Sequence, residues 1–232
     1  MTIRAITFDL DNTLWETDQS IFRAEDIMRD ALCDAASHWM HSYSFEALKT
    51  HRQQVATEYP DKSHDLGWTR REALRRWFLS QGANGAMAQE LAELGFNVFY
   101  RERQKVEPYP GVDTMLSQLA ARFPLGAITN GNADLMTMPM GRYFQFSFRA
   151  HEFPRAKPAP DMFTAALAHF QIAPHELLHV GDDPDHDVLG AASLGIRTAW
   201  VNTRALPTEA APEADLTLNS VVELIDHLTP RD

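Results

Sequence analysis

The chain has 232 residues, 44% of them hydrophobic and 23% charged, and a formal net charge of -11 at pH 7. This length allows a sizeable core in one large domain or two small ones, and the negative charge argues against a protein that binds nucleic acid through its phosphates. The single cysteine, Cys33, excludes an intramolecular disulfide. With no secretory leader pattern and no run of 18 apolar residues in view, we expect a soluble cytoplasmic protein without a membrane anchor.

Residues 3–8 are apolar and rich in β-branched side chains, which predicts a buried parallel strand. Asp9 and Asp11 follow this strand at once, with Asn12 and Thr13 behind them. Ligands bind at the carboxyl edge of an open parallel sheet, and two carboxylates so close together need a cation to keep both ionised. Taken alone, the segment is also compatible with a strand that ends in an Asp-Asn turn.

Residues 17–105 have apolar side chains at helical spacing and few strand-like runs. Four helices are predicted: one that begins near Thr17, one capped by Ser44 and stopped by Pro60, one over 69–80 and one over 86–104. We expect this insertion, residues 16–106, to form a cap domain over the carboxyl edge of the first strand. A lid at that place excludes water and selects substrates.

From residue 107 onward, strands alternate with helices. Strands are predicted at 124–129, 146–150, 198–201 and 215–218, with one more that ends at 179–180, and helices at 111–119, 160–170, 187–194 and 221–228. This alternation predicts a doubly wound, Rossmann-like parallel sheet covered on both faces. The expected α/β core domain comprises residues 1–15 and 107–232.

Three further polar clusters fall at or just beyond the ends of predicted strands: Thr129-Asn130-Gly131, Lys157-Pro158 and Gly181-Asp182-Asp183 through Asp187. In a doubly wound sheet they can converge with Asp9 and Asp11 on one crevice. Carboxylates without Cys or His partners suit Mg²⁺. The second cluster offers a hydroxyl, an amide and a free backbone N–H for an anion, and Lys157 adds a positive charge. Each cluster taken singly is also compatible with an ordinary turn or a solvated surface.

Together and in this order, the clusters resemble the motifs of the haloacid dehalogenase superfamily, and the resemblance covers the entire chain. Asp9-Leu10-Asp11-Asn12-Thr13 is similar to the first motif, Thr129-Asn130 to the second, Lys157 to the third, and Gly181-Asp182-Asp183 with Asp187 to the fourth. The insertion between the first two motifs resembles the helical cap of this family.

The resemblance implies a Mg²⁺-dependent phosphatase mechanism. Asp9 would attack phosphorus and form an aspartyl-phosphate, while Asp11 would protonate the leaving oxygen and then deprotonate the attacking water. The implied metal contacts are Asp9, the backbone carbonyl of Asp11, Asp182 and, through water or outer hydrogen bonds, Asp183 or Asp187. The implied contacts to the phosphoryl oxygens are Thr129, Asn130, Gly131 and Lys157.

Asp11 also separates the reactions known in this superfamily. Its dehalogenases lack the second aspartate because a halide leaving group needs no proton, so the presence of Asp11 favours phosphoryl transfer to water. The alternatives are a 2-haloacid dehalogenase and a binding protein that has kept the fold without the chemistry. Intact Asp9, Asp11, Lys157 and Asp182 argue against the binding protein.

Two segments, 127–133 and 178–183, resemble bacterial phosphatases that act on flavin mononucleotide (FMN) and on 5-amino-6-(5-phospho-D-ribitylamino)uracil, in riboflavin biosynthesis. A phosphoglycolate or sugar-phosphate phosphatase is the alternative. Trp68, placed by the sequence in a loop before a helix, is the cap residue predicted to contact substrate. We expect a small phosphorylated metabolite as partner, no nucleic acid or membrane, and a monomer or homodimer.

Overall fold

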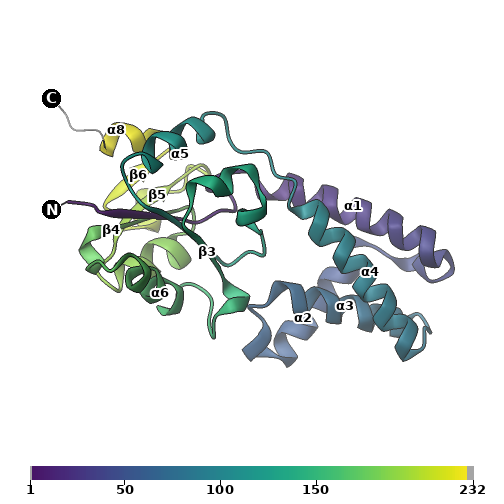
Figure 1. Cartoon of the computed structure of the whole chain (residues 1–232). Helices are drawn as coiled ribbons and strands as arrows, with labels where there is room; N and C mark the ends of the chain where they lie inside the picture. Colours follow the sequence, from purple (N-terminus) through teal and green to yellow (C-terminus); the bar gives the residue numbers. More distant parts are fainter. Residues whose placement is uncertain (1, 229–232) are drawn as a thin grey trace. The chain divides into compact units, whose positions relative to one another are not determined.

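Figure 1 shows the computed structural model of the chain, which describes residues 2–228. The chain divides into two compact units. One runs from Thr17 to Val106, and the other contains the chain up to Glu16 and from Glu107 onward. The helical unit is therefore inserted into the chain of the other unit, directly behind the first strand.

The second unit is built on a six-stranded sheet in the order β3-β2-β1-β4-β5-β6, with every neighbouring pair parallel. The strands are β1 (Ala5–Phe8), β2 (Leu125–Thr129), β3 (Phe146–Arg149), β4 (Leu177–Gly181), β5 (Arg197–Val201) and β6 (Leu216–Leu218). The predicted fold class, a doubly wound parallel sheet with an inserted helical segment, is confirmed. The central strand β1 is completely buried, as expected when helices cover both faces.

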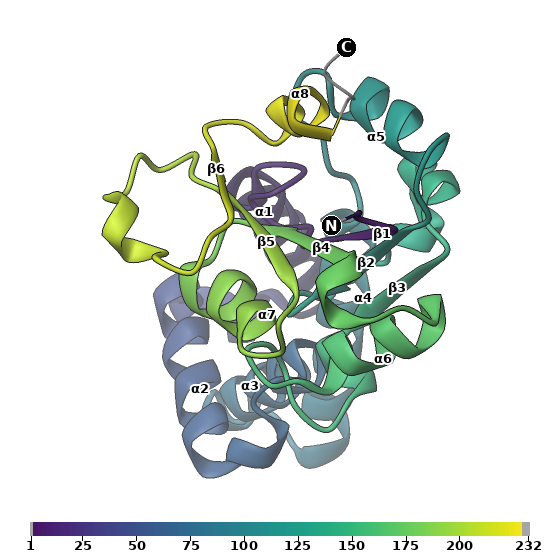
Figure 2. The same cartoon turned by 90° about the vertical axis from the view of Figure 1, so that its left-hand side faces the viewer.

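Helices cover both faces of this sheet (Figure 2). On one face lie α5 (Val112–Ala120) and α8 (Leu224–Leu228), and on the other lie α6 (Asp161–Phe170) and α7 (Gly190–Ala192). The buried core between α6 and the sheet contains Ile128 and Phe163. The strands that end at Phe8, Thr129 and Gly181 are thus held side by side with their carboxyl ends at one edge.

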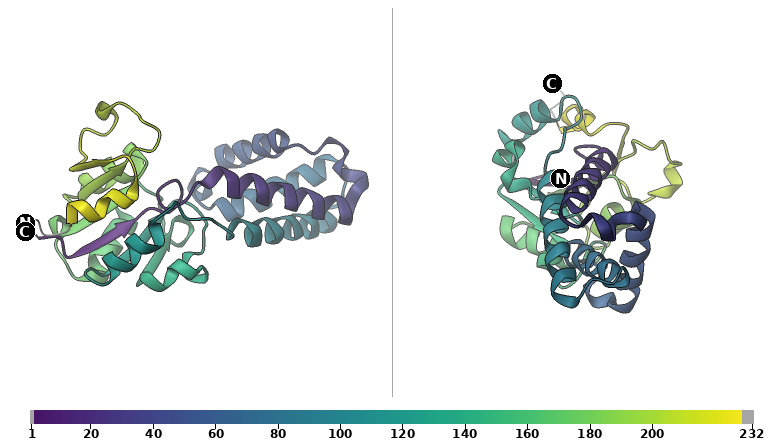
Figure 3. Two further views of the ribbon diagram at one scale, coloured as in Figure 1. Left: turned by 90° about the horizontal axis from the view of Figure 1, so that it is seen from above. Right: turned by 90° about the vertical axis from the view of Figure 1, so that its right-hand side faces the viewer.

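The helical unit contains α1 (Thr17–Ala36), α2 (Phe45–Glu58), α3 (Leu66–Ser80) and α4 (Gly85–Arg103). In Figure 3 the four helices run alongside one another; α4 packs against α1 and α3, and α2 packs against α3. Ser44 caps α2 as predicted, since its hydroxyl accepts a hydrogen bond from the Ala47 N–H at 3.1 Å. No helix within residues 2–228 combines the length and the apolar character that a membrane span needs.

Helix α3 begins earlier than the sequence predicted. The Asp65 carboxylate accepts a hydrogen bond from the Trp68 backbone N–H at 2.8 Å and so caps the helix at Leu66. The prediction of a loop up to residue 68 was therefore wrong, and Trp68 lies in the first turn of the helix. Its ring meets Tyr59 edge-on at 5.3 Å.

A buried ion pair crosses the core of the helical unit. Arg70 donates to Glu25 at 2.5 Å, and the two side chains are only 3% and 7% exposed. Glu25 also accepts from the Tyr43 hydroxyl at 2.7 Å, and the Arg70 guanidinium lies 3.4 Å from the centre of the Phe99 ring. Both charges are therefore fully partnered despite their burial, which is the condition under which such a pair is tolerated.

We predict that Glu25→Ala lowers the free energy of unfolding by about 3 kcal/mol, because it leaves the Arg70 charge buried without a carboxylate. Asp26→Ala is the matched control, since the Asp26 side chain is 65% exposed, and we expect it to change the free energy of unfolding by less than about 0.5 kcal/mol. Urea denaturation followed by circular dichroism measures both. A loss below about 1 kcal/mol for Glu25→Ala would show that the pair is not a structural support.

Candidate active site

Three buried carboxylates meet at the carboxyl edge of the sheet. Asp9, Asp182 and Asp187 each bring one oxygen to within 4.8 Å of the others. Asp9 follows β1 and Asp182 follows β4, and these strands are hydrogen-bonded neighbours in the sheet. The Asp9 N–H donates to the Val180 carbonyl at 2.8 Å, which continues the ladder by one residue. Strand pairing therefore brings together carboxylates that are 173 positions apart in the printed sequence.

Asp187 reaches this cluster from a π-helical turn, Pro184–Leu189, which leads into α7 at Gly190. The sequence predicted a helix over 187–194, but the helical segment begins at Pro184, because the Asp183 carboxylate accepts from the N–H groups of Asp185 and His186 at 3.0 and 2.9 Å and caps it there. The turn lays Asp187 against Gly181. A Cβ on Gly181 would lie 2.2 Å from the Asp187 carboxyl carbon, so only glycine permits this approach.

Lys157 connects the carboxylates. Its ammonium donates to Asp9 at 2.7 Å, to Asp187 at 2.6 Å and to the Ile128 carbonyl at 2.7 Å. Since an ammonium carries three protons, this set of acceptors satisfies all of them. Lys157 is 3% exposed, so its charge acts with little screening by water.

Asn130 positions Lys157. Its amide nitrogen donates to the Lys157 carbonyl at 2.9 Å, and its amide oxygen accepts from the Lys157 N–H at 2.9 Å. This two-point clamp ties the loop after β2 to the segment that carries the lysine. The Asn130 side chain is therefore engaged inside the protein, and the predicted contact with substrate rests on its backbone N–H alone.

The anion site predicted at Thr129-Asn130-Gly131 differs from the structure in a second detail. The Gly131 N–H, expected to be free, donates to the Thr129 hydroxyl oxygen at 2.9 Å. The expectation of a free donor at Gly131 was therefore wrong, because a short Thr turn satisfies that N–H locally. Thr129 is fully buried at the end of β2 and accepts this bond through oxygen, so its hydroxyl proton is still available to donate.

The electrostatics of the cluster call for one more cation. Burial is the main factor that raises the pKa of Asp9, only partly offset by Lys157, and burial together with Asp187 raises the pKa of Asp182 to about 6. Burial would lower the pKa of Lys157, but Asp187 and Asp9 outweigh it and raise it. Three buried carboxylates against one buried ammonium leave a formal charge of -2 (-3 + 1), and the largely exposed guanidinium of Arg204, 3.5 Å from Asp182, offsets only part of it. A divalent cation balances this charge, and an oxygen-only donor set fits Mg²⁺.

His179 supports Asp187 from inside the sheet. Its Nδ1 lies 2.9 Å from the Thr7 hydroxyl and its Nε2 lies 3.1 Å from Asp187. Burial lowers the pKa of His179 and keeps the ring neutral. Because a carboxylate only accepts, Nε2 carries the proton and Nδ1 accepts from Thr7. The His179 ring therefore orients Asp187 from within the sheet.

Asp11 lies outside the carboxylate cluster. Its carboxylate accepts a hydrogen bond from the indole N–H of Trp15 at 2.8 Å, and Trp15 is fully buried. A tight turn makes this contact possible: Asn12 has a left-handed φ of 62°, and its N–H donates to the Trp15 carbonyl at 2.8 Å. Two residues apart in sequence, Asp9 and Asp11 therefore occupy different electrostatic environments.

Sequence reasoning missed three side chains of the site. Besides Trp15, Arg204 lies 3.5 Å from the Asp182 carboxylate, and the Trp200 indole donates to the Asp182 carbonyl at 3.0 Å. Arg204 lies in the segment that follows β5, and Trp200 lies on β5. No motif marks either residue, because their roles depend on β5 lying next to β4. Trp68, the predicted substrate contact, belongs to the helical unit, and its role stays a prediction.

Comparison with known proteins gives a family match and individual relatives. The profile of the haloacid dehalogenase-like hydrolases matches residues 3–195. The 5-amino-6-(5-phospho-D-ribitylamino)uracil phosphatase YigB of Escherichia coli (strain K12) is 34% identical over 201 residues, which cover 86% of this chain and 83% of that protein. A phosphoserine phosphatase of Thermus thermophilus is 29% identical over 211 residues, 87% of this chain and 81% of that protein.

Among solved structures, a 2-haloacid dehalogenase from Pseudomonas syringae pv. Tomato DC3000 superimposes with a TM-score of 0.91. It is 34% identical in sequence, and the match covers 98% of each chain. A putative hydrolase, YfnB from Bacillus subtilis, described as bound to magnesium, superimposes with a TM-score of 0.68 at 18% identity. This second likeness concerns the fold alone.

We predict that Gly181→Ala weakens Mg²⁺ binding by about 10- to 100-fold, because the new methyl group displaces Asp187 and with it a partner of Lys157. Gly85→Ala is the matched control, since no atom lies within 4 Å of a Cβ built there. Isothermal titration calorimetry of both variants and the parent measures the effect, with circular dichroism as a check of folding. Unchanged Mg²⁺ affinity in folded Gly181→Ala would show that Asp187 does not govern the metal site.

Proposed function

This chain belongs to the haloacid dehalogenase-like hydrolase family, and we propose that it is a Mg²⁺-dependent phosphatase that hydrolyses a small phosphorylated metabolite. The observation that carries the proposal is the separation of two carboxylates. Asp9 lies in the charge cluster beside Lys157, whereas Asp11 is bound to Trp15 outside it. Two carboxylates in contrasting environments are suited to different roles, one as nucleophile and one as acid and base.

In the first step, an Asp9 oxygen attacks phosphorus and the bond from phosphorus to the ester oxygen breaks. Asp11 gives its proton to the leaving oxygen, which departs as an alcohol. In the second step, Asp11 takes a proton from water, and the water oxygen attacks the aspartyl-phosphate. Inorganic phosphate leaves, and the Asp9 carboxylate and the protonated Asp11 are restored.

Lys157, Thr129 and the backbone N–H of Asn130 are assigned to the phosphoryl oxygens. Lys157 is held rigidly by the Asn130 clamp and by its carboxylate partners. Because its three protons are already engaged, it acts on the phosphoryl oxygens through its fixed positive charge, which needs little reorganisation in the transition state. Thr129 presents its hydroxyl from the neighbouring strand. Gly131 shapes this turn through its bond to Thr129 and retains the predicted place next to the phosphate.

Asp9, Asp182 and the backbone carbonyl of Asp11 would hold Mg²⁺. The bound ion supplies positive charge that keeps Asp9 ionised and stabilises the phosphoryl oxygens. Asp187 is assigned to the outer position, ahead of Asp183. One Asp187 oxygen accepts from Lys157 and His179 and the other accepts from the Asp183 N–H, so both oxygens already have partners.

The dehalogenase alternative remains the second candidate because of the similar structure from Pseudomonas syringae. A halide leaves without a proton, so that reaction gives Asp11 no task as an acid. This chain has the second carboxylate and a buried tryptophan that holds it at 2.8 Å. Chloride release from 2-chloropropionate tests this alternative directly.

For the substrate, we propose FMN or 5-amino-6-(5-phospho-D-ribitylamino)uracil, with phosphoglycolate and sugar phosphates as alternatives. The relative from Escherichia coli that acts on the ribitylaminouracil phosphate supports this choice. We also propose a cytoplasmic enzyme that acts in the riboflavin pathway as a monomer or homodimer.

We predict that Asp9→Asn lowers kcat for phosphate release by about 10³-fold or more, because an amide keeps the shape of the nucleophile without its reactivity. The measurement is phosphate release with Mg²⁺ from FMN, the ribitylaminouracil phosphate, phosphoglycolate, sugar phosphates and nucleotides, repeated in excess chelator. Asp185→Asn, an exposed carboxylate near the site, is the matched control and is expected to retain activity.

Retained turnover in Asp9→Asn, or full activity in chelator, would contradict the mechanism. A preference for phosphoglycolate or sugar phosphates would leave the mechanism in place and overturn the substrate. Activity on none of the esters, with chloride released from 2-chloropropionate, would favour the dehalogenase. No activity in either assay would favour a binding protein.

We predict that Asp11→Asn separates the two steps. With p-nitrophenyl phosphate, whose leaving group needs no proton, this variant should release a burst of about one equivalent of nitrophenolate and then turn over slowly, because water activation is lost. With an alkyl phosphate both steps need Asp11, so no burst is expected. Rapid-mixing kinetics measure this, with the parent protein as control. An equal loss of turnover rate on both substrates, without a burst, would rule out the dual role of Asp11.

A further inference from the structure

The helical unit contains a pocket of its own, with a volume of about 330 Å³. Helix α2 contributes Phe45, Lys49, Arg52 and Gln53 to its lining, and α3 contributes Leu66 and Thr69. All of these residues belong to the helical unit, and none of them is part of the carboxylate cluster. Its volume falls at the lower end of the range for small-molecule sites.

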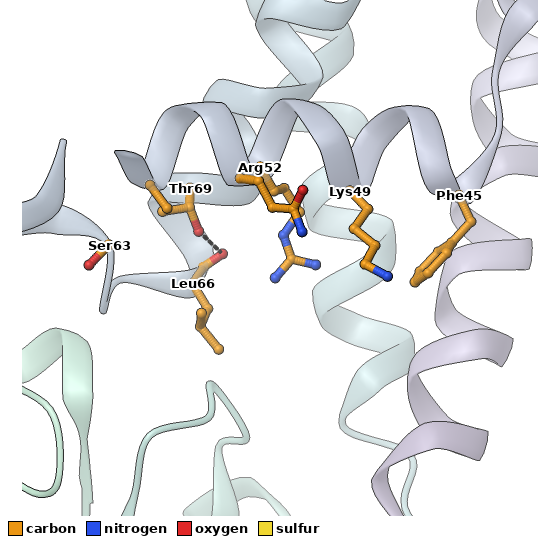
Figure 4. Close-up of a pocket in the computed structure, with 8 residues that line it drawn as sticks. Phe45, Lys49, Arg52, Ser63, Leu66 and Thr69 are labelled. Carbon is orange, nitrogen blue, oxygen red and sulfur yellow. Dashed lines mark hydrogen bonds between the residues drawn. The ribbon is translucent and has the colours of Figure 1, made fainter. Parts of the chain in front are cut away.

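One face of α2 brings two cations to this pocket. Phe45, Lys49, Arg52 and Ala56 recur at intervals of three and four residues, which places them on the same side of the helix. Figure 4 shows the Lys49 amine and the Arg52 guanidinium extending from α2 to the same side. Lys49 is 52% exposed and lies 3.8 Å from Glu46, so its own ion pair is weak and solvated.

Arg52 is a half-buried cation without a carboxylate partner within residues 2–228. The nearby buried carboxylate, Glu25, is already engaged by Arg70 at 2.5 Å and by Tyr43 at 2.7 Å. Burial, followed by the charge of Arg70, lowers the pKa of Arg52 to about 10, although Glu25 opposes the shift. Arg52 therefore stays protonated at neutral pH in a place that does not favour its charge.

An unfavourable charge at a pocket is expected where a ligand supplies the missing partner. The planar guanidinium donates two parallel hydrogen bonds that match a carboxylate or a phosphate group. Phe45, Ala56 and Leu66 offer apolar surface beside it, and Gln53 offers an amide. The excess positive charge stands out in a chain whose net charge is -11.

We propose that this pocket binds a small organic anion, with its carboxylate or phosphate group paired to Arg52 and its compact apolar body against Phe45 and Leu66. The proposal goes beyond the phosphatase reaction and rests on none of the catalytic residues. The same chemistry fits two sources, a substrate that carries a second anionic group or a separate effector. Arg52 is assigned as the main anion ligand because Lys49 is largely solvated.

The test is site-resolved binding to the full chain by two-dimensional NMR of amide and arginine side-chain N–H groups, without Mg²⁺. The probes are benzylphosphonate and benzoate, with benzyl alcohol as the uncharged match. We expect saturable shifts in residues 45–69 for both anions, weakened about tenfold or more in Arg52→Gln. Arg29→Gln is the control of equal charge change, since Arg29 is exposed and pairs with Asp26 and Asp30, and it should bind like the parent.

A stability measurement separates loss of binding from loss of fold. Because Arg52 has no ion pair to lose, the melting temperature of Arg52→Gln should equal or exceed that of the parent. Unchanged anion affinity in Arg52→Gln, equal binding of benzyl alcohol, or no shifts in residues 45–69 would each overturn the proposal. A folded variant that has lost binding would support it.

Kinetics with two matched phosphate esters identify the source of the anion. 6-Phosphogluconate and sorbitol 6-phosphate differ by one carboxylate. If the anion belongs to the substrate, Arg52→Gln raises KM for 6-phosphogluconate about tenfold relative to sorbitol 6-phosphate. If it belongs to an effector, the ratio of the two KM values stays constant while the NMR binding is lost. Absence of phosphatase activity would remove this arm only, because the NMR test does not depend on catalysis.

Discussion

The site depends on one interaction, the ammonium of Lys157 placed between Asp9 and Asp187. Without a cation between them, the two carboxylates would repel each other, and burying their charges would be unfavourable. The lysine ammonium contacts both at 2.7 and 2.6 Å and donates its remaining hydrogen bond to the Ile128 carbonyl on β2. It therefore ties β1, β2 and the turn after β4 to one point. Two further residues support this interaction. Asn130 holds the Lys157 backbone, and His179 holds the Asp187 carboxylate.

This arrangement leaves the buried cluster with excess negative charge. One ammonium holds the cluster together, but it does not neutralise three carboxylates. Burial, together with the remaining negative charge, raises the pKa values of Asp9 and Asp182. A divalent cation would balance this excess of negative charge. Asp11 avoids this competition because the turn at Asn12 directs it to Trp15. The nucleophilic role proposed for Asp9 and the acid-base role proposed for Asp11 therefore both follow from a change of environment over two residues.

The helical unit also contains buried charges, but only some of them have partners of opposite charge. Glu25 and Arg70 form a buried pair in which both charges have partners. Arg52 lies close enough to be influenced by both of their charges, yet no carboxylate of residues 2–228 pairs with it. A structural ion pair and an unsatisfied cation thus occur within one small bundle. The first links α1 to α3, and the second gives the adjacent pocket its preference for an anion.

The sequence by itself determined the fold class, the order of the polar clusters and the carboxylate character of the site, because apolar strands followed at once by Asp, Thr or Gly-Asp leave a local pattern. Helix caps such as Ser44 were also readable, since a cap is a contact between residues three apart. Only the tertiary structure decided how the clusters share their partners. The engaged N–H of Gly131, the clamp from Asn130 to Lys157 and the contacts of Arg204 and Trp200 with Asp182 depend on which strands lie side by side. The π-helical turn at Pro184 follows from the close packing of Asp187 against Gly181. The unpaired charge of Arg52 follows from Glu25 being engaged by other residues. Neither feature leaves a periodic signal in the sequence.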